Sequence, residues 1–282
     1  MFRIEDFKGN NDCIIAYKIV EKQYVDSIVN RGQIYFGLLE DYRRMEAEGK
    51  DSIGDHCEAS LTTQIIECIG DSKGNYTEIH GPNAGCNIRI DANQCAFCCY
   101  MVGLKSFKKG VDGKYRLRIP YSVLKRICED KGGVEKCSII IFDTRQISKI
   151  CDSLKRRKLW HDKGEVMYDD YNYIPKNKDI KSPGYALECC FHKQKKYAYQ
   201  KEFRIAALNT DKKPIDDLFI AVEENDFQVA ELKDGYDFCC CVEVQAKEIS
   251  SRVVEVELNF EHTLEISREY EGDDESIRRR IQ

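Results

Sequence analysis

Apolar residues occur along the whole sequence in short runs, and polar residues, glycine or proline interrupt every run before about 18 residues, the length a membrane span needs. Runs rich in Val, Ile, Cys and aromatic residues are typical of strands. We expect strands at 13–20, 33–39, 60–70, 86–90, 94–104, 137–143, 164–174, 201–208, 217–222, 237–245 and 253–259. Apolar residues at helical spacing predict helices at 22–32, 120–132, 144–160 and 184–200.

Strands outnumber helices towards the C-terminus, whereas helices interrupt the earlier part of the chain. This order favours an α+β fold over a regular βαβ succession. We predict a mixed, mainly antiparallel β core with inserted helices, formed by residues 1–265 as a single α+β domain. Residues 105–165 are the expected helical insertion, and 266–282 form a charged tail.

The composition restricts where the protein works and what it binds. Of 282 residues, 42% are hydrophobic and 33% are charged, which is typical of a protein that stays in water. The net charge of -5 argues against the basic footprint of duplex-binding proteins. The N-terminal stretch MFRIEDFKGNND is too charged for a secretory signal, so we expect a cytoplasmic protein without a membrane partner.

The 15 cysteines form an odd total and lie mostly in apolar, strand-like runs. Cys95 and Cys98 have the spacing of half a zinc site, but no second pair completes four ligands. We therefore expect reduced, buried cysteines that pack as small hydrophobic side chains.

The stretch YAYQKEFRIA, residues 197–206, contains a polar residue at every second position. If residues 199–206 are extended, then Gln200, Glu202 and Arg204 project from one face of a strand. An exposed polar sheet face, with a Glu202–Arg204 neighbour pair, explains this pattern without any function.

A functional interpretation assigns Glu202 a role in breaking the bond between nicotinamide and its ribose. That cleavage develops positive charge on the sugar, and a fixed carboxylate that accepts a hydrogen bond from the ribose 2'-hydroxyl stabilises such a state. Gln200 would orient the ribose or the acceptor. The common phosphate-binding motifs, G-x-G-x-x-G after a strand and the Walker A lysine loop, are absent from the sequence.

The segment YQKEFRI resembles the Q/E-x-E element of the ADP-ribosyltransferase superfamily, with Gln200 at its first position and Glu202 at the catalytic glutamate. The opening IIAYKIVEKQYVDSIVNRGQIYFG is similar to the first strand, helix and second strand of that superfamily. There an Arg or His on the first strand contacts NAD, and the matching positions here are Tyr17 and Lys18. The chain also looks like a group of uncharacterised bacterial and prophage proteins. The resemblance implies an ADP-ribosyltransferase-like fold and NAD as substrate, with no metal.

A second constellation lies in the polar stretch LEDYRRMEAEGKDSIGDHCEA, residues 39–59. Arg43 could bind a pyrophosphate bidentately, and Tyr42 could stack on a base or nicotinamide ring. Asp55 and Glu58 could instead hold Mg²⁺ through carboxylate oxygens. A surface loop whose acids are merely solvated explains the same residues.

We therefore expect an enzyme that transfers ADP-ribose from NAD to a protein or nucleic-acid acceptor, possible settings being toxin activity and phage defence. Glu202 and Gln200 are its predicted catalytic residues, and the predicted cofactor-binding residues are Tyr17, Lys18, Tyr42, Arg43 and Arg204. Two alternatives remain open. One is a metal-dependent phosphodiesterase or nuclease centred on Asp55 and Glu58, and the other is a non-catalytic module that binds a nucleotide or a partner protein.

Overall fold

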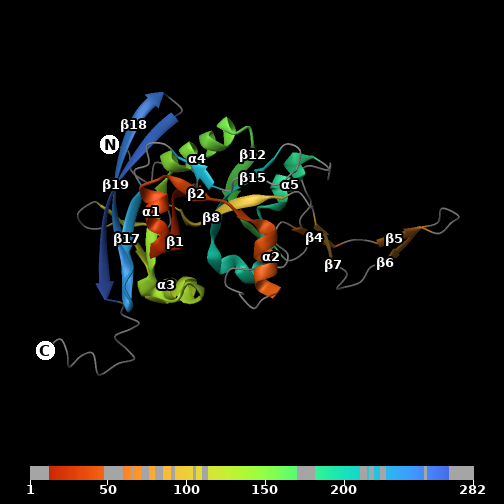
Figure 1. The fold of residues 1–282 in the computed structure, drawn as a ribbon, viewed down its shortest axis with the longest axis horizontal. Helices are drawn as coiled ribbons and strands as arrows, with labels where there is room; N and C mark the ends of the chain where they lie inside the picture. The colour runs from red at the N-terminus through yellow and green to blue at the C-terminus, as the bar shows by residue number, and fades with distance from the viewer. Residues whose placement is uncertain are drawn as a thin grey trace, which may run out of the picture. The chain divides into compact units, whose positions relative to one another are not determined.

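The computed structural model describes the greater part of the chain, in segments that run from residue 13 to residue 266 (Figure 1). The described residues are 13–47, 60–64, 67–70, 76–79, 85–89, 93–103, 106–109, 114–169, 182–209, 215, 219–222, 227–250 and 253–266. They belong to two compact units. The first unit comprises 1–34, 99–152 and 220–282, and the second comprises 35–98 and 153–219.

The first unit contains two antiparallel sheets, and helices connect some of their strands along the sequence. Its elements are β1 (Cys13–Glu21), α1 (Lys22–Val29), β9 (Lys108–Lys109), β10 (Tyr115–Ile119), α3 (Tyr121–Cys128), β11 (Cys137–Asp143), β17 (Gln228–Glu231), β18 (Tyr236–Ser250) and β19 (Val253–Ile266), with the short 3-10 helices Glu129–Lys131 and Val134–Lys136. Four elements have residues in both units: β2 (Gln33–Tyr35), β8 (Cys95–Gly103), α4 (Thr144–Arg156) and β16 (Phe219–Ala221).

In one sheet of the first unit, β1 pairs with β8 on one side and with β11 on the other, and β17 pairs with the far edge of β11. All seven residues of β11 are buried, so this strand is covered on both faces. In the other sheet, β18 pairs with β10 and with β19, and Figure 1 shows β18 and β19 as one long hairpin.

Apolar side chains from both sheets and from α3 form a single buried cluster in the first unit. Its members include Ile15, Ile139, Leu117, Leu124 and Phe238, all at most 6% exposed. The helix α3 contributes because its apolar residues recur at helical spacing on one face.

Buried carboxylates fix the starts of two helices in the first unit. Asp237, on β18, accepts a hydrogen bond from the backbone N–H of Tyr121 at 2.7 Å at the start of α3. Asp143 accepts from the backbone N–H groups of Arg145 and Gln146 at the start of α4. Each acceptor satisfies N–H groups that a helix start leaves without an intrahelical partner.

The second unit is also mixed. Its elements are β3 (Gly37–Leu38), α2 (Leu39–Ala47), β4 (Ser60–Gln64), β5 (Glu67–Gly70), β6 (Tyr76–Ile79), β7 (Gly85–Arg89), β12 (Trp160–Glu165), β13 (Met167–Asp169), α5 (Pro183–Cys189), β14 (His192–Gln194), η5 (a 3-10 helix, Lys195–Gln200) and β15 (Glu202–Leu208). The strand β15 lies between β12 and β8 and is antiparallel to β12. The buried apolar cluster of the second unit includes Leu39, Ala96, Tyr185, Cys189 and Leu208.

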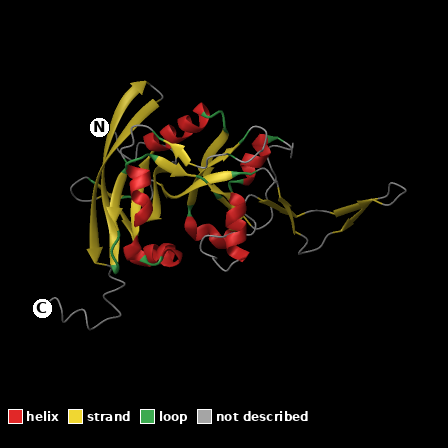
Figure 2. Ribbon diagram, viewed as in Figure 1, coloured by secondary structure: helices red, strands yellow, loops and turns green. Residues whose placement is uncertain are grey.

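The predicted α+β class with mainly antiparallel strands is confirmed, as the mixture of strands and helices in Figure 2 illustrates. The helices expected at 22–32, 120–132 and 144–160 form as α1, α3 and α4. The helix expected at 184–200 was wrong beyond Cys189, because the chain turns there into β14 and η5. The segment 105–165, expected as a helical insertion, contributes strands β10, β11 and β12 as well as helices.

Two further expectations concern the membrane and the chain end. No helix within the described ranges is long and apolar enough to cross a lipid bilayer. The predicted charged tail, 266–282, lies outside the described residues apart from Ile266, the last residue of β19.

Candidate functional site

The polar motif of residues 197–206 is divided between two elements of the second unit. The residues up to Gln200 belong to η5, and β15 begins only at Glu202. Between them, Lys201 has a φ of 45°, in the left-handed region that residues with a Cβ seldom adopt. The premise of an extended 199–206 segment was therefore wrong, and Gln200 does not belong to the strand that carries Glu202 and Arg204.

Two hydrogen bonds hold the backbone of Glu202, the first residue of β15, in place. The carbonyl oxygen of Glu202 accepts a hydrogen bond from the backbone N–H of Val166 at 3.0 Å. Its own N–H donates to the hydroxyl oxygen of Tyr168 at 2.9 Å. Tyr168 lies on β13 directly opposite Lys193 on β14, because these two strands pair in parallel. The backbone of Glu202 is therefore fixed through both its N–H group and its carbonyl oxygen, independently of the contacts of its side chain.

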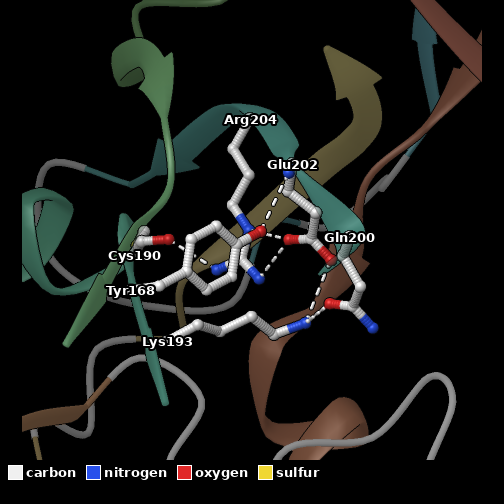
Figure 3. A network of polar contacts seen from close by, with 6 residues as sticks. All are labelled: Tyr168, Cys190, Lys193, Gln200, Glu202 and Arg204. Atoms are coloured by element: carbon white, nitrogen blue, oxygen red, sulfur yellow. Dashed lines mark hydrogen bonds and ion pairs between the residues drawn. The ribbon is translucent and has the colours of Figure 1, made fainter. Parts of the chain in front are cut away.

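The carboxylate of Glu202 binds two cations, one on each oxygen. Oε1 accepts a hydrogen bond from Nζ of Lys193 at 3.0 Å, and Oε2 accepts from Nε of Arg204 at 2.8 Å. The lysine and arginine side chains are 2% and 1% exposed, whereas that of Glu202 is 13% exposed. Figure 3 shows both cationic side chains converging on this carboxylate.

Each cation also donates to a second acceptor. Nζ of Lys193 donates to Oε1 of Gln200 at 2.7 Å, and Nη1 of Arg204 donates to the carbonyl oxygen of Cys190 at 2.6 Å. Nζ of Lys193 also lies 5.1 Å from the ring centroid of Tyr197, within the range of a cation–π contact. Lys193 therefore links Gln200 to Glu202, although the two residues lie on different elements.

The ionisation of Glu202 follows from these contacts. Burial by itself would raise the pKa of the carboxyl group, but the charges of Arg204 and Lys193, with hydrogen bonds from both, lower the pKa to about 2. The group is therefore ionised throughout the physiological pH range. A carboxylate of this kind is a poor proton donor and a weak base, but it is a permanent acceptor for a hydroxyl group or a developing cation.

Gln200, Glu202 and Arg204, predicted as parts of one site, do lie together. Gln200 and Arg204 are 3% and 1% exposed, so the exposed polar sheet face that the alternation equally suggested is absent from this described stretch. The other predicted cofactor-binding residues belong to other elements, β1 and α2.

Tyr17 and Lys18 belong to β1 of the first unit. Tyr17 is 7% exposed, and its ring stacks on Tyr100 at a centroid distance of 5.1 Å. Burial raises the pKa of its hydroxyl group. Lys18 is half-buried next to it in the sequence.

Tyr42 and Arg43 lie on α2 in the second unit. The half-buried ring of Tyr42 packs against the second unit's apolar cluster, and its hydroxyl group comes close to Gly37, where a Cβ would be only 2.4 Å away. The side chain of Arg43 lies outside the described part of the structure.

The alternative metal ligands Asp55 and Glu58 also lie outside the described residues. Within the described ranges, no group of three or more His, Cys, Asp and Glu side chains is arranged to hold a metal ion. Eleven cysteines of these ranges form no disulfide, and of these Cys95, Cys99, Cys189, Cys190 and Cys240 are buried, as expected for small hydrophobic side chains.

The sequence analysis did not identify Lys193 as part of this cluster. Lys193 belongs to the run HKQKK, whose polar composition predicts that all three lysines are exposed to solvent. Lys195 and Lys196 are exposed, whereas Lys193 is buried. Lys193 follows the end of α5 by four residues, and this position was a usable signal only if the helix was expected to end at Cys189.

Comparison of the chain with family models, with curated proteins and with solved structures finds no match. The functional interpretation therefore depends on the geometry around Glu202.

Proposed function

We propose that this protein is an ADP-ribosyltransferase-like enzyme that cleaves NAD at the nicotinamide–ribose bond, with Glu202 as its catalytic carboxylate. The supporting observation is a permanently ionised carboxylate at the start of β15, fixed through both oxygens and still 13% exposed. Oε1 has a second lone pair beyond the one used by Lys193, so Glu202 can accept a further hydrogen bond from a ribose hydroxyl.

Preorganisation is the physical basis of the proposal. A carboxylate that is already fixed and charged needs no reorganisation when positive charge develops on the sugar. At about 4 Å and an effective dielectric constant near 20, two unit charges attract by roughly 4 kcal/mol, which corresponds to about a thousandfold in rate. In this scheme Gln200, held by Lys193, orients the ribose or the acceptor group.

The cluster also has an excess of positive charge, because Lys193 and Arg204 face a single carboxylate. This excess suits the anionic pyrophosphate of NAD but opposes a cationic transition state, so the rate effect of Glu202 depends on direct contact with the ribose. The proposal includes an ADP-ribosyltransferase-like arrangement of the core, with a protein or nucleic-acid acceptor and without a metal ion. Conflict between bacteria and phages is the proposed setting.

A buried ion cluster can also have a purely structural role, without any part in catalysis. The experiment must therefore separate catalysis from stability. Purified protein is incubated with NAD labelled in its adenosine part, with and without cell lysate, and released nicotinamide is measured alongside label in protein, RNA and DNA. Glu202→Gln keeps the shape of the side chain and an acceptor for one of the two cations but removes the charge, and we expect at least about a 100-fold loss of turnover in a protein that still folds.

Glu188→Gln provides the matched control, since it removes a half-buried carboxylate from α5 of the same unit. It should retain wild-type turnover. Equal turnover in Glu202→Gln and wild type would exclude the catalytic assignment. Thermal stabilisation by NAD without any product would instead support the non-catalytic nucleotide-binding alternative. Activity that is lost with a chelator and restored by Mg²⁺ would support a metal-dependent enzyme.

A further inference from the structure

Three aromatic side chains of the second unit are exposed to solvent. Tyr35, Phe219 and Trp160 are 46%, 45% and 49% exposed. The rings of Tyr35 and Phe219 contact each other, with their centroids 5.2 Å apart and their planes inclined by 48°. Single exposed apolar side chains are common on protein surfaces, but rings that lie together form a patch on which a partner can bind.

Strand alternation explains why the two contacting rings face outward. The strands β2 and β16 pair with each other, and successive residues of a strand point to opposite faces. Ile34, which precedes Tyr35 on β2, is buried. Ile220, which follows Phe219 on β16, is buried as well. The buried isoleucines therefore fix the orientation of both strands, and the rings point into solvent.

The end of α4 supplies positive charge beside these rings. Four consecutive cations, residues 155–158, are all exposed. Nη1 of Arg157 donates to the backbone carbonyl oxygen of Phe219 at 3.1 Å, and this contact holds the guanidinium group next to the strand that carries the ring. Trp160 follows Arg157 by three residues, so the Cα atoms of these two residues lie within about 11 Å of each other.

Cations at the end of a helix also have a structural explanation, because they stabilise its negative end. That explanation suits Lys155 and Arg156, the last two residues of α4. The backbone itself closes the helix, since the N–H of Leu159 donates to the carbonyl oxygen of Leu154 at 3.1 Å. Arg157 instead binds the backbone of β16, so its position follows from the strand that carries Phe219.

The surroundings of Tyr35 are compatible with an anionic partner. Burial, and then the charge of Asp41, raise the pKa of the Tyr35 hydroxyl group, so the ring stays uncharged at neutral pH. Asp41 is itself paired with Arg44, whose Nη2 lies 2.6 Å from its Oδ1. The ion pair largely balances the negative charge of Asp41.

We propose that Tyr35, Phe219 and the cations around Arg157 bind single-stranded nucleic acid, with bases stacked on the rings and phosphates against the cations. Every base has a face that stacks on an aromatic ring, and a run of cations attracts the charged backbone. The bases of a duplex stack on one another and do not offer their faces. Preference for single strands agrees with the net charge of -5, which is unlike that of duplex-binding proteins. The proposal does not rest on cleavage of NAD.

Fluorescence anisotropy with the full-length protein, without NAD, tests this proposal. The probes are labelled single strands of oligothymidylate DNA and oligouridylate RNA, each about 12 nucleotides long, within the range of known single-strand sites. Binding of either strand at low salt supports the proposal, and a duplex of the same length should bind at least about tenfold more weakly.

Variants separate stacking from charge. Phe219→Ala and Tyr35→Ala should each weaken binding about tenfold, because each removes a surface on which a base stacks. Neither should alter the dependence of binding on salt. Arg157→Gln should weaken binding and also reduce the slope of log affinity against log salt by about 0.7, as expected for the loss of one phosphate contact.

Matched controls come from the first unit, where Tyr24 is an exposed aromatic residue of α1 and Lys125 an exposed cation of α3. Tyr24→Ala and Lys125→Gln should keep wild-type affinity. Thermal melting identifies variants that do not fold, and Tyr35→Leu replaces Tyr35→Ala in that case, since it removes the flat ring but keeps an apolar side chain.

Three results would overturn the proposal. Neither single strand binds the wild-type protein at low salt, a duplex binds as tightly as the single strands, or both ring variants keep wild-type affinity. Competition by polyglutamate that is as effective as competition by unlabelled oligonucleotide would also overturn it, and would assign the surface to an acidic protein partner. Loss of nucleic-acid binding would leave the assignment of Glu202 untouched, because that assignment is tested by nicotinamide release.

Discussion

Nζ of Lys193 lies 3.0 Å from Oε1 of Glu202, and the lysine side chain is only 2% exposed. The same distance separates Lys22 from Glu231 in the first unit, where the side chains are 41% and 79% exposed. The two pairs therefore have equal lengths and different surroundings. They provide a direct comparison of a buried and an exposed ion pair within one chain.

Lys193→Met should lower the free energy of unfolding by about 3 kcal/mol, because the change leaves Gln200 and one oxygen of Glu202 without their buried donor. Lys22→Met removes an equally short pair from the surface and should cost less than about 1 kcal/mol. Urea unfolding of both variants measures the difference. Similar losses in the two variants would contradict the view that burial sets the strength of the Lys193 contact.

The low pKa of Glu202 predicts how stability depends on pH. The pKa is about 2 in the folded protein, below its ordinary value of 4.5. A group with a lowered folded-state pKa stabilises the protein above the unfolded-state pKa, and this contribution is lost as the pH falls from about 4.5 towards 2. The shift corresponds to about 3 kcal/mol at neutral pH.

Glu202→Gln should therefore be less stable than wild type at pH 7, and the difference should shrink between pH 4.5 and pH 2. Chemical denaturation at a series of pH values measures it. Glu231→Gln, which alters an exposed carboxylate, should keep the wild-type dependence over the same range. A constant gap between Glu202→Gln and wild type at all pH values would show that the charge of Glu202 is not responsible.

Much of the local structure could be predicted from the sequence, because the buried apolar residues recur at the spacing of a helix or a strand. The helix α4 and the buried strand β11 form where apolar spacing predicts them. The start of β15 could not be predicted in this way. The alternation of Gln200, Glu202 and Arg204 continues across Lys201, but a left-handed φ at a lysine leaves no trace in hydrophobicity.

Gln200, Glu202 and Arg204 of the candidate site could be predicted from the sequence, but Lys193 could not. Lys193 is buried because Glu202 and Gln200 offset the cost of removing its charge from water, and that pairing joins residues on different elements. Hydropathy assigns every lysine to the surface. The sequence therefore indicates Glu202 and Arg204 but not the lysine that links Glu202 to Gln200.

The close contact between Gly37 and Tyr42 predicts a steric effect. A Cβ at position 37 would lie 2.4 Å from the hydroxyl oxygen of Tyr42 and 2.9 Å from its Cζ atom. Gly37→Ala should therefore lower stability by about 1–3 kcal/mol, as overpacking usually does. The double variant Gly37→Ala/Tyr42→Leu removes the ring and should be more stable than the additive value. Thermal melting of the two single variants and the double variant tests this coupling, and strict additivity would show that the ring swings away freely.

Arg204 makes contacts that lysine cannot reproduce. Its Nε and Nη2 atoms both bind Oε2 of Glu202, while Nη1 donates to the carbonyl oxygen of Cys190 at 2.6 Å. A lysine ammonium is a single point donor, so Arg204→Lys cannot satisfy both acceptors and should cost about 2 kcal/mol. Arg31 binds Asp26 through the same two nitrogen atoms, but that pair is 64% and 57% exposed.

Arg31→Lys is therefore the matched control and should change stability by less than about 0.5 kcal/mol, because water replaces the lost contact at the surface. Urea unfolding compares the two substitutions. If Arg204→Lys were as mild as Arg31→Lys, the carbonyl oxygen of Cys190 would have to gain another donor, and the cluster would be less rigid than a preorganised catalytic site requires. A large loss for Arg204→Lys with wild-type NAD turnover would instead assign Arg204 to the fold alone and leave Glu202 as the residue on which catalysis depends.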